Sequence, residues 1–306
     1  MRAALAQTAS IAVIVFAVSS MFSVGLAYSV RSIVGPLREV RAVFRALVAN
    51  FVLVPLFAVA IERIIPIEPP LALGLFLLAA SAGAPFLIKL ASAARSDLAL
   101  SAALLLLLVP ATVVFLPFYV PLAMAHPSLS GLTYVPANLL AIGVPLLSTM
   151  ILPLVVGLVV HATAPRWAAR LVPIVGKLAT VTLLIVVIAT FAANFHEVLR
   201  ILKTGAIGAA LALIGGAFAI GYLMSGRDRG VVLGLATSQR NIAAAMVVAS
   251  RSFGDPDVLV MVTASSIVGL IVLFPIAWLL SRRKPRLGPP TKSVRPSLPS
   301  GIPEPA

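Results

Sequence analysis

The chain has 306 residues, of which 61% are hydrophobic and only 10% are charged, and its mean hydropathy is +1.13. A soluble domain carries about 25% charged residues, so this composition excludes a soluble globular protein and indicates an all-α polytopic membrane protein. The absence of cysteine excludes disulfides, thiol catalysis and thiolate metal sites. The net charge of +14 would favour a nucleic-acid partner in a soluble protein, but membrane topology explains it without one.

Apolar runs close to the ~20 residues of a membrane helix are separated by polar or Pro/Gly breaks. They predict nine spans, at residues 10–30, 42–62, 71–91, 98–122, 138–160, 171–194, 205–224, 230–250 and 258–281. With the N-terminus outside, sixteen of the 23 lysines and arginines fall on the inner side and five on the outer side. This bias predicts an N-terminus outside and a C-terminus inside. The compact loops favour a bacterial inner membrane.

The two ends of the chain need separate interpretations. Arg2, the apolar run after it and the small residues at 25–27 could form a cleaved signal peptide, but the run is long for a signal core, and the arginine-rich loop that follows needs a helix to hold it inside. Residues 1–281 therefore form the predicted transmembrane domain. Residues 282–306, rich in Pro, Ser and basic side chains, predict a disordered cytoplasmic tail that serves as an orientation signal or contacts lipid headgroups.

Polar residues deep inside the spans are few. All nine acidic residues fall in loops or near helix ends, so the carboxylates typical of proton relays and sodium sites are not deep in any span. Arg240 is the opposite case, because it stands eleven residues from both Arg229 and Arg251. That places it roughly 16 Å from either face, beyond the reach of an arginine stem of about 6 Å. It must face a polar cavity or a partner.

The neighbours of Arg240 also favour a break in the helix. Thr237, Ser238, Gln239 and Asn241 hydrogen-bond locally and are poor residues for a membrane helix. An interrupted helix exposes backbone groups and helix-end dipoles to whatever binds there. The functional interpretation is a binding site, because so many donors gather at one depth. The alternative is a structural polar knot in which Arg240 ties carbonyls of neighbouring helices together.

Two further polar residues are candidates for the same site. Lys89 lies six residues before Arg95 and could snorkel to the cytoplasmic face, but Gly83-Ala84-Pro85 predicts a second helix break just before it. Two interrupted spans, one in each half of the chain, indicate an inverted-repeat transporter site. Asn50, in RALVANFVLVPLF, is either interhelical glue or a site residue.

Several segments, in the same order and spacing, resemble the bile acid:sodium symporter family. MFSVGLAYSV is similar to its Met-Phe-Gly-x-Gly-Leu helix, and ANFVLVPL to its Gln-Phe-x-x-x-Pro stretch. LALGLFLLAASAGAPFLIKLASAARSDLALS resembles its first broken helix, and MILPLVVGLVVH its Leu-Leu-Pro-x-x-x-Gly-Leu helix. GLATSQRNIAAAMVVAS resembles its second broken helix. The resemblance covers about residues 18–281.

The resemblance implies two inverted five-helix repeats that form a panel domain and a core domain, with the two broken helices crossing in the core. A nine-helix chain with its N-terminus outside matches members that lack the first helix. The family binds sodium through a Ser-Asn pair on the first broken helix and a Glu and a Gln on the second. Here Phe86-Leu87-Ile88-Lys89 replaces the pair and the Glu is absent. Gln239 or Asn241 retains an amide, and Asn50 falls where the family has a sodium-site Gln.

These observations predict a secondary transporter of a small organic anion that works by alternating access and without sodium. Lys89 and Arg240 would either stand in for the ions or contact the substrate. The alternatives are a sodium-coupled anion symporter with a remodelled site and a membrane receptor that does not transport. An enzyme is not expected, because no span carries a carboxylate pair, a metal cluster or a nucleophile–base set. No cofactor, metal or nucleic-acid partner is expected, and sodium binding is doubtful. Membrane lipid is expected to contact the chain. The sequence leaves the oligomeric state open. The predicted substrate-binding residues are Arg240, Lys89, Asn241, Gln239, Thr237, Ser238 and Asn50.

Overall fold

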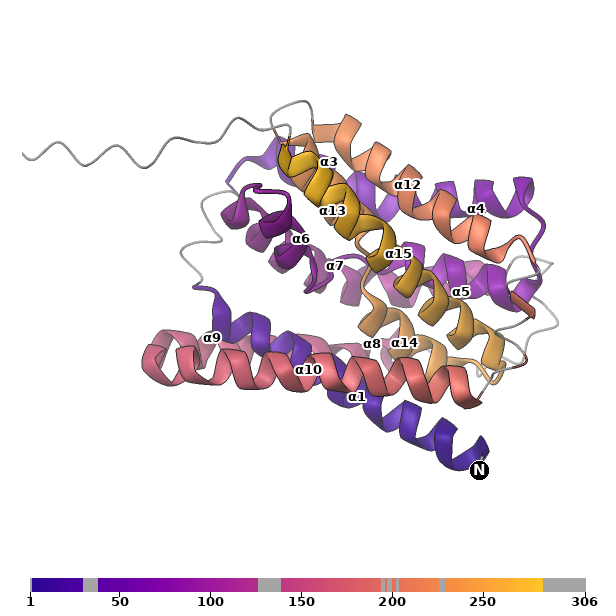
Figure 1. Ribbon diagram of the computed structural model, residues 1–306, viewed down its shortest axis with the longest axis horizontal. Helices are drawn as coiled ribbons and strands as arrows, with labels where there is room; N and C mark the ends of the chain where they lie inside the picture. The colour runs from indigo at the N-terminus through magenta and orange to yellow at the C-terminus, as the bar shows by residue number, and fades with distance from the viewer. Residues whose placement is uncertain are drawn as a thin grey trace, which may run out of the picture.

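The computed structural model describes residues 2–29, 38–125, 139–193, 196, 200–201, 204–225 and 229–282, and these form helices joined by short loops (Figure 1). The predicted tail, residues 282–306, lies outside the described residues except for Arg282. In the first half of the chain the elements are α1 (Arg2–Ala27), α3 (Val40–Val48), η1 (Ala49–Leu53), α4 (Val54–Ile64), α5 (Pro69–Ala80), α6 (Leu87–Ala93) and α7 (Leu98–Met124). In the second half they are α8 (Leu139–Leu146), η3 (Leu147–Ile151), α9 (Leu152–Thr163), α10 (Pro165–Ala193), α12 (Ala206–Ser225), α13 (Gly230–Ser238), α14 (Ile242–Ser252) and α15 (Pro256–Arg282).

The described residues contain eight helices that are long and apolar enough to cross a membrane. The predicted span at 71–91 is not one of them, because it is divided into the short helices α5 and α6. The predicted start of the first span at residue 10 agrees with the apolar part of α1, Ser10–Ala27, although the helix itself begins at Arg2. The predicted break in the span at 230–250 is confirmed by the separate helices α13 and α14.

The helices pack into two groups. Helix α1 packs against both α10 and α9, and Figure 1 shows α1 and α10 crossing each other, apart from α12 and α4. The other group contains α4, α5, α6, α7, α12, α13, α14 and α15, of which α14 also contacts α1 and α15 also contacts α10. In the first half two long helices precede the broken helix α5/α6 and α7 follows it, whereas in the second half three long helices precede the broken helix α13/α14 and α15 follows it. This division matches the panel and core that the resemblance implies.

Close backbone contact joins α1 to α9. A Cβ added to Gly25 would lie 2.2 Å from the carbonyl oxygen of Leu154, and one added to Gly157 would lie 2.6 Å from that of Phe22. Small residues at such a crossing let two membrane helices approach closely enough for dispersion contacts between their backbones.

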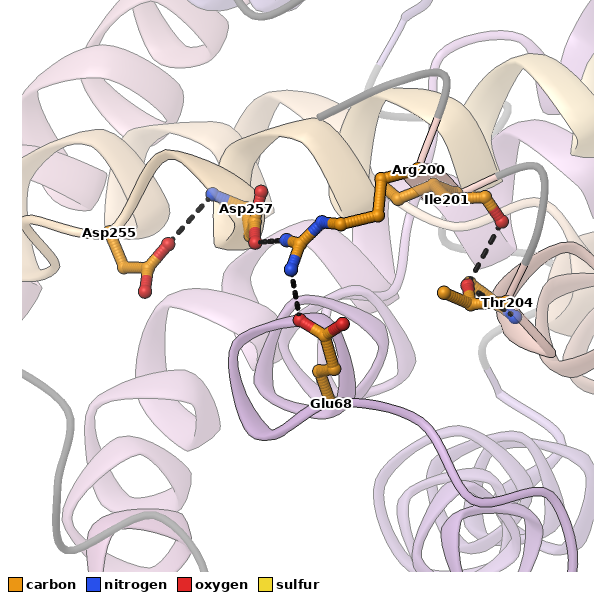
Figure 2. Close-up of polar contacts among 7 residues, drawn as sticks. Glu68, Arg200, Ile201, Thr204, Asp255 and Asp257 are labelled. Atoms are coloured by element: carbon orange, nitrogen blue, oxygen red, sulfur yellow. Dashed lines mark hydrogen bonds and ion pairs between the residues drawn. The ribbon is translucent and has the colours of Figure 1, made fainter. Parts of the chain in front are cut away.

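An ion-pair cluster lies at the end of the molecule where α5 and α15 begin. Figure 2 shows the guanidinium of Arg200, from the connection between α10 and α12, pointing between the carboxylates of Glu68 and Asp257. Nη1 lies 2.5 Å from Glu68 Oε2, and Nη2 bonds Asp257 Oδ2. These contacts fasten the connection between the two groups of helices onto the core.

Candidate functional site

The two broken helices meet at their breaks. After α5 the chain runs extended through Ser81, and Gly83 adopts a φ of +80°. A Cβ at Gly83 would lie 2.7 Å from the backbone nitrogen of Val109 in α7, so both the conformation and the space require glycine there. Thr112 of α7 accepts a hydrogen bond from Ala82 N and donates one to Ala82 O, both at 2.9 Å. The first break is therefore held against α7.

Asn241 links the second break to the first. Its backbone N–H donates to Ser81 O at 2.8 Å, and its Nδ2 donates to Gly83 O at 2.9 Å. Its Oδ1 accepts from Ala244 N at 3.1 Å, so it also caps the start of α14. The backbone and side chain of the buried Asn241 thus bond the segment after α5, cap the start of α14, and hold the two breaks together.

Arg240 lies at the centre of this crossing and is only 4% exposed. Nε donates to Leu78 O at 3.2 Å, and Nη1 donates to Asn50 Oδ1 at 2.7 Å and Thr237 O at 2.9 Å. Nη2 donates to Asn50 O at 3.4 Å and to Ala79 O. A guanidinium has five N–H donors, so five oxygens match five donors, and all of these acceptors are neutral.

Three of these oxygens come from helix ends. Leu78 and Ala79 belong to the last turn of α5, and Thr237 to the last turn of α13. Carbonyls in a last turn have no partner within their own helix and carry the negative end of the helix dipole. Two helix C-terminal ends therefore converge on one cation, which donates to Ala79 O and Thr237 O, adds a second donor to Leu78 O beside Ser81 N, and supplies the compensating charge.

The other two oxygens belong to Asn50, and the local sequence explains why they are available. Asn50 lies in the π-helical turn η1, where Val54 N bonds back to Ala49 O. Pro55 has no N–H, so it cannot donate to the carbonyl of Asn50 or of Phe51. Asn50 O accepts from Arg240 instead, and Phe51 O accepts from the hydroxyl of Tyr119. π-helical turns of this kind are frequent at functional sites.

Thr237, Ser238 and Gln239 differ in their roles. The hydroxyl oxygen of Thr237 accepts from Asn50 Nδ2 at 3.2 Å, which closes a ring with Arg240. Ser238 donates within its own helix to Leu235 O at 3.4 Å. Gln239 is 6% exposed, and its carboxamide has no hydrogen-bond partner among the described residues. Of the predicted residues, the structure brings Arg240, Asn241, Thr237 and Asn50 into one network.

Lys89 is not part of this network. It lies in α6, is exposed, and its Nζ stands 4.9 Å from the centroid of the Phe86 ring. It lines a pocket of about 190 Å³ between α1, α10 and the segment from Pro85 to Lys89. Ser20, Ser23 and Thr180 supply hydroxyl groups to this pocket. Lys89 and Arg240 therefore occupy different places, one at the boundary of the two helix groups and one in the centre of the core.

Tyr28 also lines this pocket, just after the end of α1. Its phenol hydroxyl is neutral near pH 7, as an ordinary tyrosine is, and can donate a hydrogen bond. Among the described residues, no carboxylate pairs with Lys89. The pocket thus combines an uncompensated ammonium with several hydroxyl groups.

Some contributors were missed from the sequence. Thr112 and Tyr119 lie in the apolar helix α7, where a single hydroxyl among apolar residues is not a signal of a binding site. The carbonyls of Leu78 and Ala79 have no sequence signal, because every residue has a carbonyl. Pro55, five residues after Asn50, was the signal available for the freed carbonyl.

The comparisons with known proteins address the chain as a whole. The search among curated proteins found no match. A model of the sodium bile acid symporter family matches residues 13–201, more than half of the chain, which includes the first broken helix and ends before the second. Together with the apolar helices and the two crossing breaks, this match means that the chain belongs to the sodium bile acid symporter family and is a multi-pass membrane transporter of that type.

Proposed function

We propose that this protein is a secondary transporter of a small organic anion that works by alternating access without sodium. The observation that carries the proposal is the saturation of the Arg240 guanidinium by five oxygens at the crossing of the two broken helices. The guanidinium does what a bound metal cation would do: it gathers carbonyls from separate helix ends and compensates their dipoles. Unlike a metal ion, it cannot leave.

This saturation also separates the two roles considered for Arg240. An arginine that binds an anionic substrate must present free N–H groups to it, preferably two in parallel. All five N–H groups of Arg240 already have neutral acceptors within the protein. Arg240 therefore stands in for the ion, and the substrate charge is recognised elsewhere.

The pocket that contains Lys89 is the better candidate for the substrate. Its ammonium has no carboxylate partner among the described residues, and hydroxyl groups of α1 and α10 line the same pocket. A pocket of about 190 Å³ is smaller than the roughly 300–1,000 Å³ of sites for drug-sized ligands. The substrate is thus a compact anion, held by Lys89, Tyr28 and the serines of α1.

The position of this pocket suits alternating access. It lies between the group formed by α1 and α10 and the core segment that follows the first break. A relative shift of the two groups would open it to one side and then to the other, while the Arg240 network keeps the core rigid. With Arg240 fixed in place, the negative charge of the substrate offsets the charge of Lys89 during the shift, which fits a facilitator or an exchanger.

Anion uptake into proteoliposomes, measured with sodium and then with potassium as the only added cation, tests this proposal. We expect equal rates in both, and thermal stabilisation by the same anions in both salts. Lys89→Gln should abolish stabilisation by the anion, while Lys177→Gln, an exposed lysine on α10 outside the pocket, should not. A sodium requirement would indicate a sodium-coupled symporter with a remodelled site. Stabilisation without any flux would indicate a receptor.

A further inference from the structure

A second and larger cavity lies away from the crossing. Its volume is about 680 Å³, and it is enclosed by one face of η1 and α4, the start of α5 and the end of α7. The lining is mostly apolar and includes Pro55, Val59, Phe76 and Leu122. The cavity shares no lining residue with the pocket around Lys89, so the transport site does not account for it.

The cavity opens on the surface that faces the bilayer. Leu56 and Leu122, which line it, are 62% and 66% exposed. Both stand in helices that are long and apolar enough to cross the membrane. An open apolar cavity at this depth would be filled by hydrocarbon rather than by water. A lipid chain is therefore the occupant that the lining favours.

One end of the cavity is charged. Glu62 and Arg63, in the last turn of α4, both line it. The Oε1 atom of Glu62 is buried and has no hydrogen-bond partner among the described residues. Neighbouring side chains on a helix do not face each other, and Glu62 makes no ion pair within the described part of the chain. A buried carboxylate oxygen without a donor carries the full cost of desolvation, unless a ligand supplies the donor.

We propose that this cavity binds a phospholipid whose headgroup carries a protonated amine with N–H donors, as phosphatidylethanolamine does. The ammonium donates to Glu62 Oε1, the phosphate lies against the guanidinium of Arg63, and an acyl chain fills the space between α4, α5 and α7. The acidic and basic side chains match the two opposite charges of the headgroup. The unpartnered carboxylate selects the lipid, because a choline headgroup has no N–H to donate and an anionic headgroup meets the charge of Glu62.

Lipid retention by the purified protein, measured by native mass spectrometry, tests this inference. The probes are phosphatidylethanolamine, its N-methyl and N,N-dimethyl derivatives, phosphatidylcholine and phosphatidylglycerol, all with identical acyl chains. We expect retention of the first three, since each keeps an N–H donor, and a sharp loss at phosphatidylcholine. Equal retention of phosphatidylcholine would overturn the proposal, as would a preference for phosphatidylglycerol or a second copy of the chain in place of lipid.

A variant localises the effect. Glu62→Gln keeps the shape and one acceptor oxygen but removes the charge, so it should weaken retention of phosphatidylethanolamine roughly fivefold. Glu68→Gln, which removes a nearby carboxylate that does not line the cavity, should leave the order of lipids unchanged. An unchanged preference in Glu62→Gln would overturn the assignment. The series of methylated lipids uses the unaltered protein, so it decides the matter even if this variant does not fold.

Discussion

Two arginines in this protein differ in burial and in the charge of their partners. Arg240 is 4% exposed and donates to five neutral oxygens from three segments of the core. The Arg200 side chain is 43% exposed and pairs with two carboxylates at the end of the molecule (Figure 2). Formal ion pairing would rank Arg200 as the stronger interaction. Burial reverses this ranking, because removing Arg240 leaves several buried oxygens without a donor, whereas the Arg200 and Glu68 side chains are both 43% exposed and only Asp257 is buried.

The largest effect is therefore expected at Arg240. Arg240→Ala removes a buried charge whose acceptors then lack donors, which should lower the free energy of unfolding by about 3–5 kcal/mol. Denaturant or thermal unfolding in detergent measures this loss. The vacated oxygens should then accept a small cation, so sodium should stabilise the variant but not the unaltered protein. Equal sodium stabilisation of both proteins would mean that Arg240 does not take the place of an ion.

A substitution of Gly83 tests whether the stability of the crossing depends on the backbone conformation there as well as on Arg240. Gly83→Ala must adopt a φ of +80° and places a Cβ 2.7 Å from the backbone nitrogen of Val109, so it should destabilise the protein by about 2–4 kcal/mol. Gly208→Ala in α12 is the matched control, because nothing lies within 4 Å of the added atom. It should be neutral or slightly stabilising. Similar losses in both variants would contradict a conformational requirement at Gly83.

Substitutions of Asn50 test how much the acceptor oxygens of the Arg240 guanidinium contribute to stability. Asn50→Ala deletes the oxygen 2.7 Å from Nη1 and the donor to Thr237, which should cost about 1–3 kcal/mol. Asn50→Asp keeps an oxygen at the same place and gives Arg240 a charged partner, so its stability should stay close to that of the unaltered protein. If the Asp variant is the less stable of the two, the oxygen of Asn50 is not what Arg240 requires.

The sequence predicted one arginine and not the other, for a physical reason. A charge eleven residues from both membrane faces has no way to reach water, so the position of Arg240 alone demands a partner and a break. The breaks at 83–85 and 237–241 followed from Gly, Pro and short polar side chains. Arg200, Glu68 and Asp257 are far apart in sequence, and each could have been a solvated charge. Which exposed charges meet depends on how the helices pack.

Lys89 shows a second limit of the sequence. Its spacing from the Pro85 break and from Arg95 was compatible with the crossing and with snorkelling to the cytoplasmic face, because a lysine stem is long and flexible. The structure places it in the lining of the pocket. The direction in which the chain leaves the break decides where Lys89 lies, and that direction depends on Gly83 and its contacts with α7.

The smallest effect is expected at Arg200, and it completes the comparison. Arg200→Gln should cost no more than about 1 kcal/mol, because exposed ion pairs gain little over hydration. The cost is not zero, since the Asp257 side chain is only 8% exposed and loses its partner. Ionic strength distinguishes the two arginines, and choline chloride is the salt to use because its cation is too bulky to enter the crossing. Added salt should reduce the loss of unfolding free energy in Arg200→Gln by screening. It should leave the loss in Arg240→Ala unchanged. If Arg200→Gln costs as much as Arg240→Ala, or if salt affects both alike, burial is not what separates the two sites.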